Sequence, residues 1–286
     1  LITMNHSAES LHIAKRFNEL HQLIYVRGGI KPTNTAIEEL TKLLLLQIAK
    51  AKFGSHQVGK YGDLSSILNL ASLENEGNIE SLKAAFTSVN LMEEMAVRGS
   101  SGVTQSIWPQ DEPLRLNRLD VAIEAFSILD LIIPDGELTS EIVDPLGIAF
   151  DSFLRGKYEN AGGLGTYLTP ENIVKFMAKT GFDLLESKSN NDSGLYGDPC
   201  CGSGRFLLGI MNEAKGRASS FNHLALENNL FGADVSASSV AMARVNLLAS
   251  GITEPNVLVV DDSITNQLVL KETTKFSLIL TNPPFG

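Results

Sequence analysis

This chain of 286 amino acids has only two cysteines, Cys200 and Cys201, and they are adjacent. Adjacent cysteines provide neither a disulfide framework nor the ligand spacing of a metal site. We therefore expect no metal centre and a reducing, cytoplasmic environment. The composition, 43% hydrophobic and 20% charged, is that of a globular protein.

The chain also lacks long apolar runs and an excess of positive charge. Its apolar runs, such as Leu43–Leu46, are far too short to span a bilayer, so we expect no membrane partner. No signal peptide is evident, because the sequence has no basic segment that is followed by an apolar one. The formal net charge of −10 argues against this chain alone gripping a nucleic-acid backbone.

Residues 1–143 have helical periodicity and predict an α-helical N-terminal domain. In the amphipathic stretch 35–53, Thr35 and Glu38 have the spacing of a capping box. The sequence "DPLGIAFDSFL" predicts a helix that begins at Asp144, which would cap it, with Pro145 in its first turn. A second domain is expected from this point, over residues 144–286.

Strand patterns alternate with helical patterns from Leu195 onward. Strands are expected at residues 195–199, 229–235, 256–262 and 276–281, and helices at 169–187, 204–216 and 236–251. In the first of these helices, Thr169 would be the cap and Pro170 the first residue. Strands that alternate with helices predict an α/β fold with a parallel sheet and helices on its faces.

Chemically informative residues follow the first three predicted strands. In a parallel sheet these carboxyl ends meet at one edge, where ligands bind. Asp198 ends the first strand, and Gly202 and Gly204 then allow a tight turn, although the third glycine of a dinucleotide fingerprint is missing. Asp234 ends the second strand and could accept from two ribose hydroxyls or cap the next helix. Asp261 and Asp262 end the third, where one carboxylate could accept from the amine of a base or an aspartate could form a turn.

The fourth strand ends in Asn282, Pro283, Pro284 and Phe285. Proline cannot extend a central strand, but its carbonyl remains an acceptor. The side-chain oxygen of Asn282 and the carbonyl of Pro283 can therefore accept from one amino group. Phe285 offers a flat face on which a base can stack. A simple turn after a strand is the alternative reading.

Together these motifs resemble the amino-methylating DNA methyltransferases. The resemblance is closest to the adenine-N6 group, which includes the modification subunits of type I restriction systems. "DPCCGSGRFL" resembles the family's loop for S-adenosyl-L-methionine (AdoMet), "NPPF" its catalytic motif and "GTYLTPENIV" its upstream cofactor motif. The resemblance implies an AdoMet-dependent, Rossmann-like fold and methyl transfer to adenine N6 in DNA.

The resemblance also implies roles for individual residues. Those expected to bind AdoMet are Thr166, Tyr167, Leu168, Thr169, Pro170, Glu171, Asp198, Gly202, Ser203, Gly204, Arg205, Asp234 and Asp262. Those expected to hold the flipped target adenine are Asn282, Pro283, Pro284 and Phe285. Arg205 stands where the family commonly has a small residue, so its side chain is expected to point away from the cofactor.

The resemblance further implies double-stranded DNA as a partner, and a specificity subunit and a restriction subunit as possible partners. Because the family's sheet has further strands, the chain is expected to be an N-terminal fragment with an incomplete sheet, inactive by itself. Two other functions stay open. One is a methyltransferase that acts on a protein glutamine or an RNA amine, and the other is a non-catalytic AdoMet-binding subunit of a defence complex.

Overall fold

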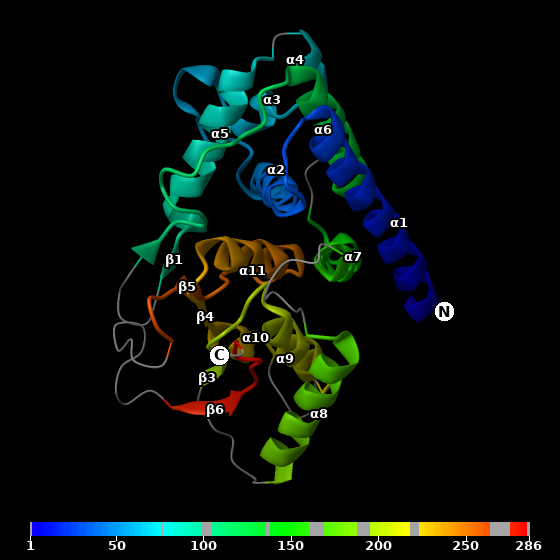
Figure 1. Ribbon diagram of the computed structural model, residues 1–286, viewed down its shortest axis with the longest axis vertical. Helices are drawn as coiled ribbons and strands as arrows, with labels where there is room; N and C mark the ends of the chain where they lie inside the picture. The colour runs from blue at the N-terminus through cyan, green and yellow to red at the C-terminus, as the bar shows by residue number, and fades with distance from the viewer. Residues whose placement is uncertain are drawn as a thin grey trace. The chain divides into compact units, whose positions relative to one another are not determined.

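The structure is a computed structural model that describes residues 2–75, 77–98, 104–134, 138–160, 169–187, 195–217, 223–263 and 275–284. The chain forms two compact units that alternate along the sequence (Figure 1). The first unit contains Leu1–Met95, Pro109–Gly162 and Ala249–Gly251. The second contains Ala96–Trp108, Gly163–Leu248 and Ile252–Gly286. The expected division into residues 1–143 and 144–286 stays a prediction of domain organisation.

The first unit is helical. Its longer helices are α1 (Ile2–Gln22), α2 (Thr33–Phe53), α5 (Ile79–Leu91), α6 (Leu119–Ile132) and α7 (Ser140–Asn160). Its shorter elements are η1 (Leu23–Arg27), η2 (Gly59–Tyr61), α3 (Leu64–Ile67), α4 (Leu70–Asn75) and η3 (Glu93–Met95). In the described part of the chain, no helix is long and apolar enough to cross a membrane.

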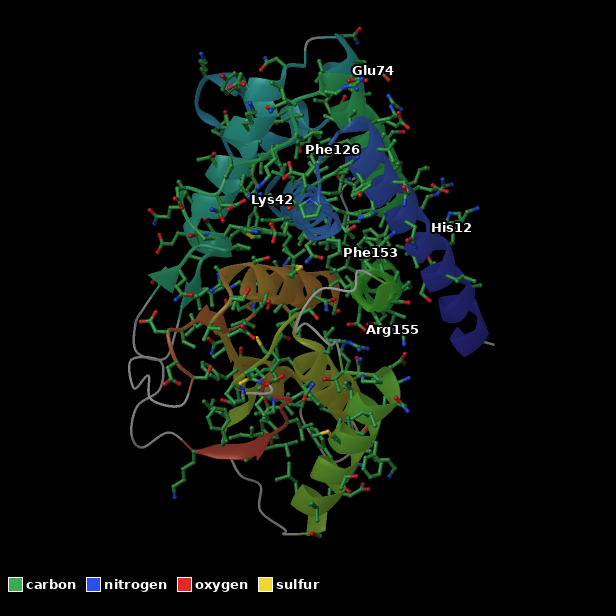
Figure 2. The ribbon with its side chains drawn as sticks, in the orientation of Figure 1. His12, Lys42, Glu74, Phe126, Phe153 and Arg155 are labelled. Atoms are coloured by element: carbon green, nitrogen blue, oxygen red, sulfur yellow. The ribbon has the colours of Figure 1, made fainter. Side chains whose placement is uncertain are left out.

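Helix α2 is the core of this unit, because nearly all of its residues from Ala36 to Ala49 are buried. Its apolar side chains pack against the neighbouring helices, so tertiary burial stabilises it along most of its length. Figure 2 shows Lys42 and Phe126 among the helices of the interior, whereas the exposed His12 and Glu74 point outward.

Two predicted helix starts are wrong. Helix α2 begins at Thr33 after Pro32, which makes no side-chain cap, so Thr35 lies inside the helix and forms no capping box. Helix α7 begins at Ser140 rather than Asp144, and Pro145 lies inside it. Because Pro145 lies beyond the first four residues of α7, whose N–H groups have no intrahelical partner, the helix forgoes one backbone hydrogen bond there.

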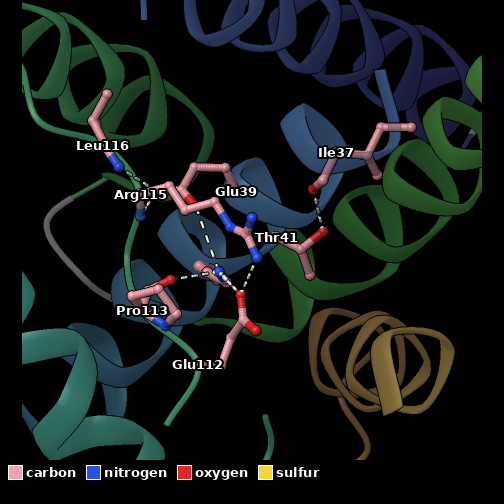
Figure 3. Close-up of polar contacts among 8 residues, drawn as sticks. Ile37, Glu39, Thr41, Glu112, Pro113, Arg115 and Leu116 are labelled. Atoms are coloured by element: carbon pink, nitrogen blue, oxygen red, sulfur yellow. Dashed lines mark hydrogen bonds and ion pairs between the residues drawn. The ribbon is translucent and has the colours of Figure 1, made fainter. Parts of the chain in front are cut away.

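A polar cluster in the first unit fixes the segment that follows Pro109 (Figure 3). Lys42 is fully buried, and its Nζ donates to Glu112 Oε1 and to the Pro113 carbonyl, both at 2.7 Å. Glu39 Oε1 accepts from the backbone N–H groups of Arg115 and Leu116, both at 2.8 Å. Burial raises the pKa of Glu39, and the charge of Lys42 opposes that rise.

The second unit is built on a parallel sheet of the order β5-β4-β3-β6. The strands are β3 (Leu195–Asp198), β4 (Leu230–Asp234), β5 (Val257–Val259) and β6 (Phe276–Ile279). The helices are α8 (Glu171–Ser187), α9 (Arg205–Gly216), α10 (His223–Asn228) and α11 (Ala237–Ala249). This confirms the predicted α/β fold. The chain proceeds outward from β3 to β5 and returns to β6 on the other side of β3. The strand order therefore reverses between β3 and β6, where such sheets bind ligands.

The two faces of the sheet have different cores. Along β4, Leu230 points to the face covered by α8, α9 and α11, and Phe231 points to the opposite face. On that opposite face, Val97 joins Phe231 and the β5 residue Leu258 in a smaller cluster. Val97 belongs to the short strand β1 (Val97–Arg98), which pairs with β2 (Thr104–Gln105).

The strap, which we define as residues 104–108, fastens to the outer strand β5. Gln105 Oε1 accepts from the Val259 N–H and Gln105 Nε2 donates to the Val259 carbonyl, both at 2.9 Å. A side-chain amide thus pairs with the free edge of β5 as a neighbouring strand would. The buried Arg244 of α11 donates to the Gln105 side chain and to the carbonyls of Ser106, Ile107 and Val257. Burial lowers the pKa of Arg244 to about 9, so it stays charged at neutral pH.

Candidate active site

The loop after β3 folds back tightly on the tip of the sheet. Gly202 and Gly204 have positive φ angles of 51° and 84°, in the left-handed region that favours glycine. A Cβ atom at Gly204 would lie 3.3 Å from the Ala243 Cβ, so the loop also needs glycine to approach α11. A Cβ atom at Gly202 would meet nothing within 4 Å, so the backbone faces open space there.

Asp198, at the end of β3, is 1% exposed. Burial raises the pKa of Asp198 to about 6; the Thr281 hydroxyl and the Cys200 N–H oppose the rise, and the charge of Asp234 adds to it. The Cys200 N–H donates to Asp198 Oδ1 at 3.0 Å. Above its pKa, Asp198 therefore places a poorly solvated negative charge at the switch point of the sheet, where a cationic ligand would stabilise it.

Asp234 joins the tip of β4 to the loop after β3. Its Oδ2 accepts from the Gly202 N–H and its Oδ1 accepts from the Ser236 N–H, both at 2.9 Å. Ser236 Oγ accepts from the Ser239 N–H at 3.2 Å and so caps α11. The capping role that was open for Asp234 thus belongs to Ser236. The carboxylate of Asp234 retains further lone pairs for a ligand.

Thr169 is the point at which three of the motifs meet. Its carbonyl accepts from the guanidinium of Arg205, and its Oγ1 accepts from Asn282 Nδ2 at 3.2 Å. Thr169 does not cap α8 as the sequence predicted, because the helix begins at Glu171 and the Pro170 carbonyl accepts the first helical N–H groups. The side chain of Arg205 is 6% exposed and directed at Thr169.

The other expected site residues are less tightly connected. Asp262 is exposed just beyond β5, at the same edge of the sheet. Glu171 forms an ion pair with Lys175, one helical turn further along α8, at 2.5 Å. Pro283 and Pro284 are exposed beyond β6. Outside the described residues lie Thr166, Tyr167, Leu168 and Phe285.

The two cysteines have the properties of packing residues. Cys201 is 5% exposed and lies in the core between the sheet and its helices. Burial raises the pKa of Cys200 and raises that of Cys201 well above its ordinary value. Both thiols are therefore protonated at neutral pH and are poor nucleophiles.

Two residues of α11 that support the site were not recognised in the sequence. Arg244 holds the strap beside β5, and Asn246 Nδ2 donates to the Ser203 carbonyl at 3.1 Å. Both are fully buried. Polar side chains at two nearby positions of the apolar sequence "VAMARVNLLA" are the signal that could have identified them, because buried polar groups require specific partners.

Comparison with known proteins identifies the family. The model of the "N-6 DNA Methylase" family matches residues 141–286. The chain is also 39% identical over 285 residues to the "Type II methyltransferase M.MamI" of Microbacterium ammoniaphilum, covering 99% of this chain and 77% of that protein. The chain belongs to the N-6 DNA methylase family. This methylase-family chain is also 25% identical over 202 residues to the "Type I restriction enzyme MjaIX methylase subunit" of Methanocaldococcus jannaschii, covering 70% of this chain and 32% of that protein.

Solved structures share the fold of this methylase-family chain. The type I restriction-modification methyltransferase subunit of Streptococcus thermophilus matches with a TM-score of 0.58 and 14% identity, over 96% of this chain and 64% of that chain. A modification subunit of a putative type I restriction enzyme from Vibrio vulnificus YJ016 matches with a TM-score of 0.55 and 17% identity, over 97% of this chain and 61% of that chain. The chain thus spans less than two thirds of either structure.

Proposed function

We propose that this chain is the catalytic part of a site-specific DNA methyltransferase that transfers a methyl group from AdoMet to adenine N6. We further propose that the enzyme is the modification component of a restriction-modification system. The observation that carries the proposal is a pair of hydrogen bonds at Thr169. The exposed Asn282 donates to its hydroxyl oxygen, and Arg205, which directly follows the glycine loop, donates to its carbonyl. A group that accepts from a target amine would thus lie beside a cofactor loop.

The residues at the tip of the sheet fit AdoMet. The backbone at Gly202 faces open space, and the buried Ser203 Oγ has no hydrogen-bond partner among the described residues. Asp198 and Asp234 place two carboxylates on adjacent strands, which suits a ligand with a sulfonium, an ammonium group and ribose hydroxyls. In the proposal, Asp234 accepts from the ribose and Asp262 from the adenine amine of the cofactor. Thr169, Pro170 and Glu171 border its methionine end.

When bound, AdoMet supplies a methyl group that its sulfonium activates. The protein's part is to make the exocyclic amine of the target a better nucleophile, since its lone pair is delocalised into the ring. The side-chain oxygen of Asn282 and the carbonyl of Pro283 accept from that amine and favour an electron-rich, tetrahedral nitrogen. Both acceptors are held on a proline-stiffened backbone, so their contribution is electrostatic and positional.

The names of the relatives support the proposed biological setting. M.MamI is named a type II methyltransferase, and the Methanocaldococcus jannaschii protein is named a methylase subunit of a type I restriction enzyme. We therefore propose double-stranded DNA as the substrate, with subunits of a restriction-modification complex as possible partners.

Asn282→Ala tests the proposed function. In the full-length protein, we expect it to lower the rate of tritiated methyl transfer to unmodified DNA by roughly 10²–10³-fold, the effect of removing one preorganised partner. AdoMet affinity, measured by calorimetry, should stay unchanged. Asn18→Ala removes an exposed asparagine on α1 and is the matched control, expected to be fully active.

The same assay separates the alternatives. Robust transfer by Asn282→Ala would contradict the proposed role of the asparagine. Transfer by the wild-type protein to RNA or to a protein glutamine, but not to DNA, would assign a different substrate. AdoMet binding without transfer to any of the three would indicate a non-catalytic subunit.

A further inference from the structure

Thr169 has a geometry that its expected contact with the cofactor does not explain. Its hydroxyl oxygen accepts from Asn282 Nδ2 at 3.2 Å, across 113 residues of sequence. Among the described residues, none donates to the side-chain oxygen of Asn282. In this arrangement the amide nitrogen of Asn282 lies against Thr169, and the side-chain oxygen is left for another donor.

That orientation matters because an asparagine side chain has a donor end and an acceptor end of nearly the same shape. The amine of a target base presents hydrogens, so it needs the oxygen. A flipped amide would direct its own N–H groups at those hydrogens, and the pairing would be repulsive. The hydroxyl of Thr169 can donate or accept, and here it accepts from the nitrogen. Once a target amine donates to the oxygen, this is the pairing that satisfies both ends of the amide.

Thr169 is itself held in place. Its carbonyl accepts from the buried guanidinium of Arg205, and Pro170 restricts the backbone of the residue before it to extended conformations. The arginine that departs from the family pattern thus holds the backbone of Thr169. Because Pro170 provides the backbone cap of α8, the Thr169 side chain is not needed as a helix cap.

We propose that Thr169 is a positioning residue for catalysis, which holds the amide of Asn282 by its nitrogen so that its oxygen is placed at the target amine, with Arg205 fixing the backbone of Thr169. This inference rests on the proposed function and adds a role to it. This role is separate from the place of Thr169 at the methionine end of the cofactor, because it acts through the hydroxyl and Asn282.

The test compares Thr169→Val, which removes the hydroxyl at nearly constant shape, with Thr169→Ser, which keeps it. In the full-length protein acting on DNA, the valine variant should lower kcat about fivefold to tenfold, the ratio that one ordinary hydrogen bond controls. Its KM for DNA and its AdoMet affinity by calorimetry should stay within about twofold. Thr169→Ser should restore kcat. Weakened AdoMet binding with an unchanged kcat would overturn the inference and make Thr169 a cofactor ligand.

A second background isolates the effect that passes through Asn282. In Asn282→Ala, which has no amide to hold, Thr169→Val should lower the residual rate by less than about twofold, and a loss as large as in wild type would overturn the inference. If Asn282→Ala is inactive but Thr169→Val has the wild-type kcat, the inference fails and the proposed function stands. If Asn282→Ala is fully active, the proposed role of Asn282 fails; the proposed function itself fails if the wild-type protein transfers no methyl group to DNA.

Discussion

Asp198→Asn should stabilise the cofactor-free protein at neutral pH while weakening its binding of AdoMet. Burial raises the pKa of Asp198 from 3.8 to about 6, so the folded chain retains a proton that the unfolded chain releases between these values. Stability therefore falls as the pH rises through this window, and the loss is complete above it. Asparagine has the same shape and no charge, so it escapes this loss.

The size of the effect follows from the shift. About two pKa units at ~1.4 kcal/mol each give a cost of roughly 3 kcal/mol for the ionised Asp198 at pH 8. For a protein of this size, that free energy corresponds to a rise in Tm of roughly 6–12 °C. The hydrogen bond from the Cys200 N–H is kept in the variant, because the side-chain oxygen of asparagine can accept it as the carboxylate does.

Calorimetric unfolding of the cofactor-free protein from pH 4.5 to pH 8 is the assay. The Tm of Asp198→Asn should exceed that of wild type at pH 8, and the two should converge toward pH 4.5, where Asp198 is protonated. Asp63→Asn is the control, because Asp63 is a helix cap at the surface that asparagine replaces well. An offset independent of pH, or a lower Tm at pH 8, would refute the reasoning.

Two further predictions concern the other carboxylate at the sheet and the polar cluster of the first unit. Asp234→Ala should weaken AdoMet binding by roughly 1–3 kcal/mol, since polar partners lose their acceptor, and unchanged affinity in calorimetry would remove Asp234 from the proposed site. Lys42→Met should lower the free energy of unfolding by roughly 3–5 kcal/mol in urea titration, because it removes the cation beside the buried carboxyl group of Glu39. Lys83→Met, which breaks the exposed pair with Glu80, should cost less than ~1 kcal/mol, and equal losses for both lysines would contradict the explanation.

The sequence predicted the second unit well because local pattern and tertiary role agree there. Each predicted strand from Leu195 onward is present, and the helices α8, α9 and α11 follow the predicted ranges closely. Buried parallel strands are continuous apolar runs with polar residues at their tips, and this pattern is visible without a structure. The positions of Asp198 and Asp234 at the tips of β3 and β4 were predictable for the same reason.

Other features depend on contacts that no local pattern contains. The hydroxyl of Thr169 reaches Asn282 rather than the first turn of α8, a choice that only the packed sheet determines. The start of α2 differs from the prediction because Pro32 can precede a helix without a side-chain cap when burial stabilises that helix. The attachment of Gln105 to β5 joins residues that are 154 positions apart, so the sequence near either gives no sign of the other.

This attachment has a consequence for the order in which the chain folds during synthesis. The strap emerges from the ribosome before Val259, and at about 5–20 residues per second the interval is roughly 8–30 s. Until α11 and β5 are made, the strap, which includes the buried Ile107 and Trp108, lacks Arg244 and Val259, the residues that hold it. We expect the nascent chain to present this apolar segment to chaperones and to complete the second unit only late in translation.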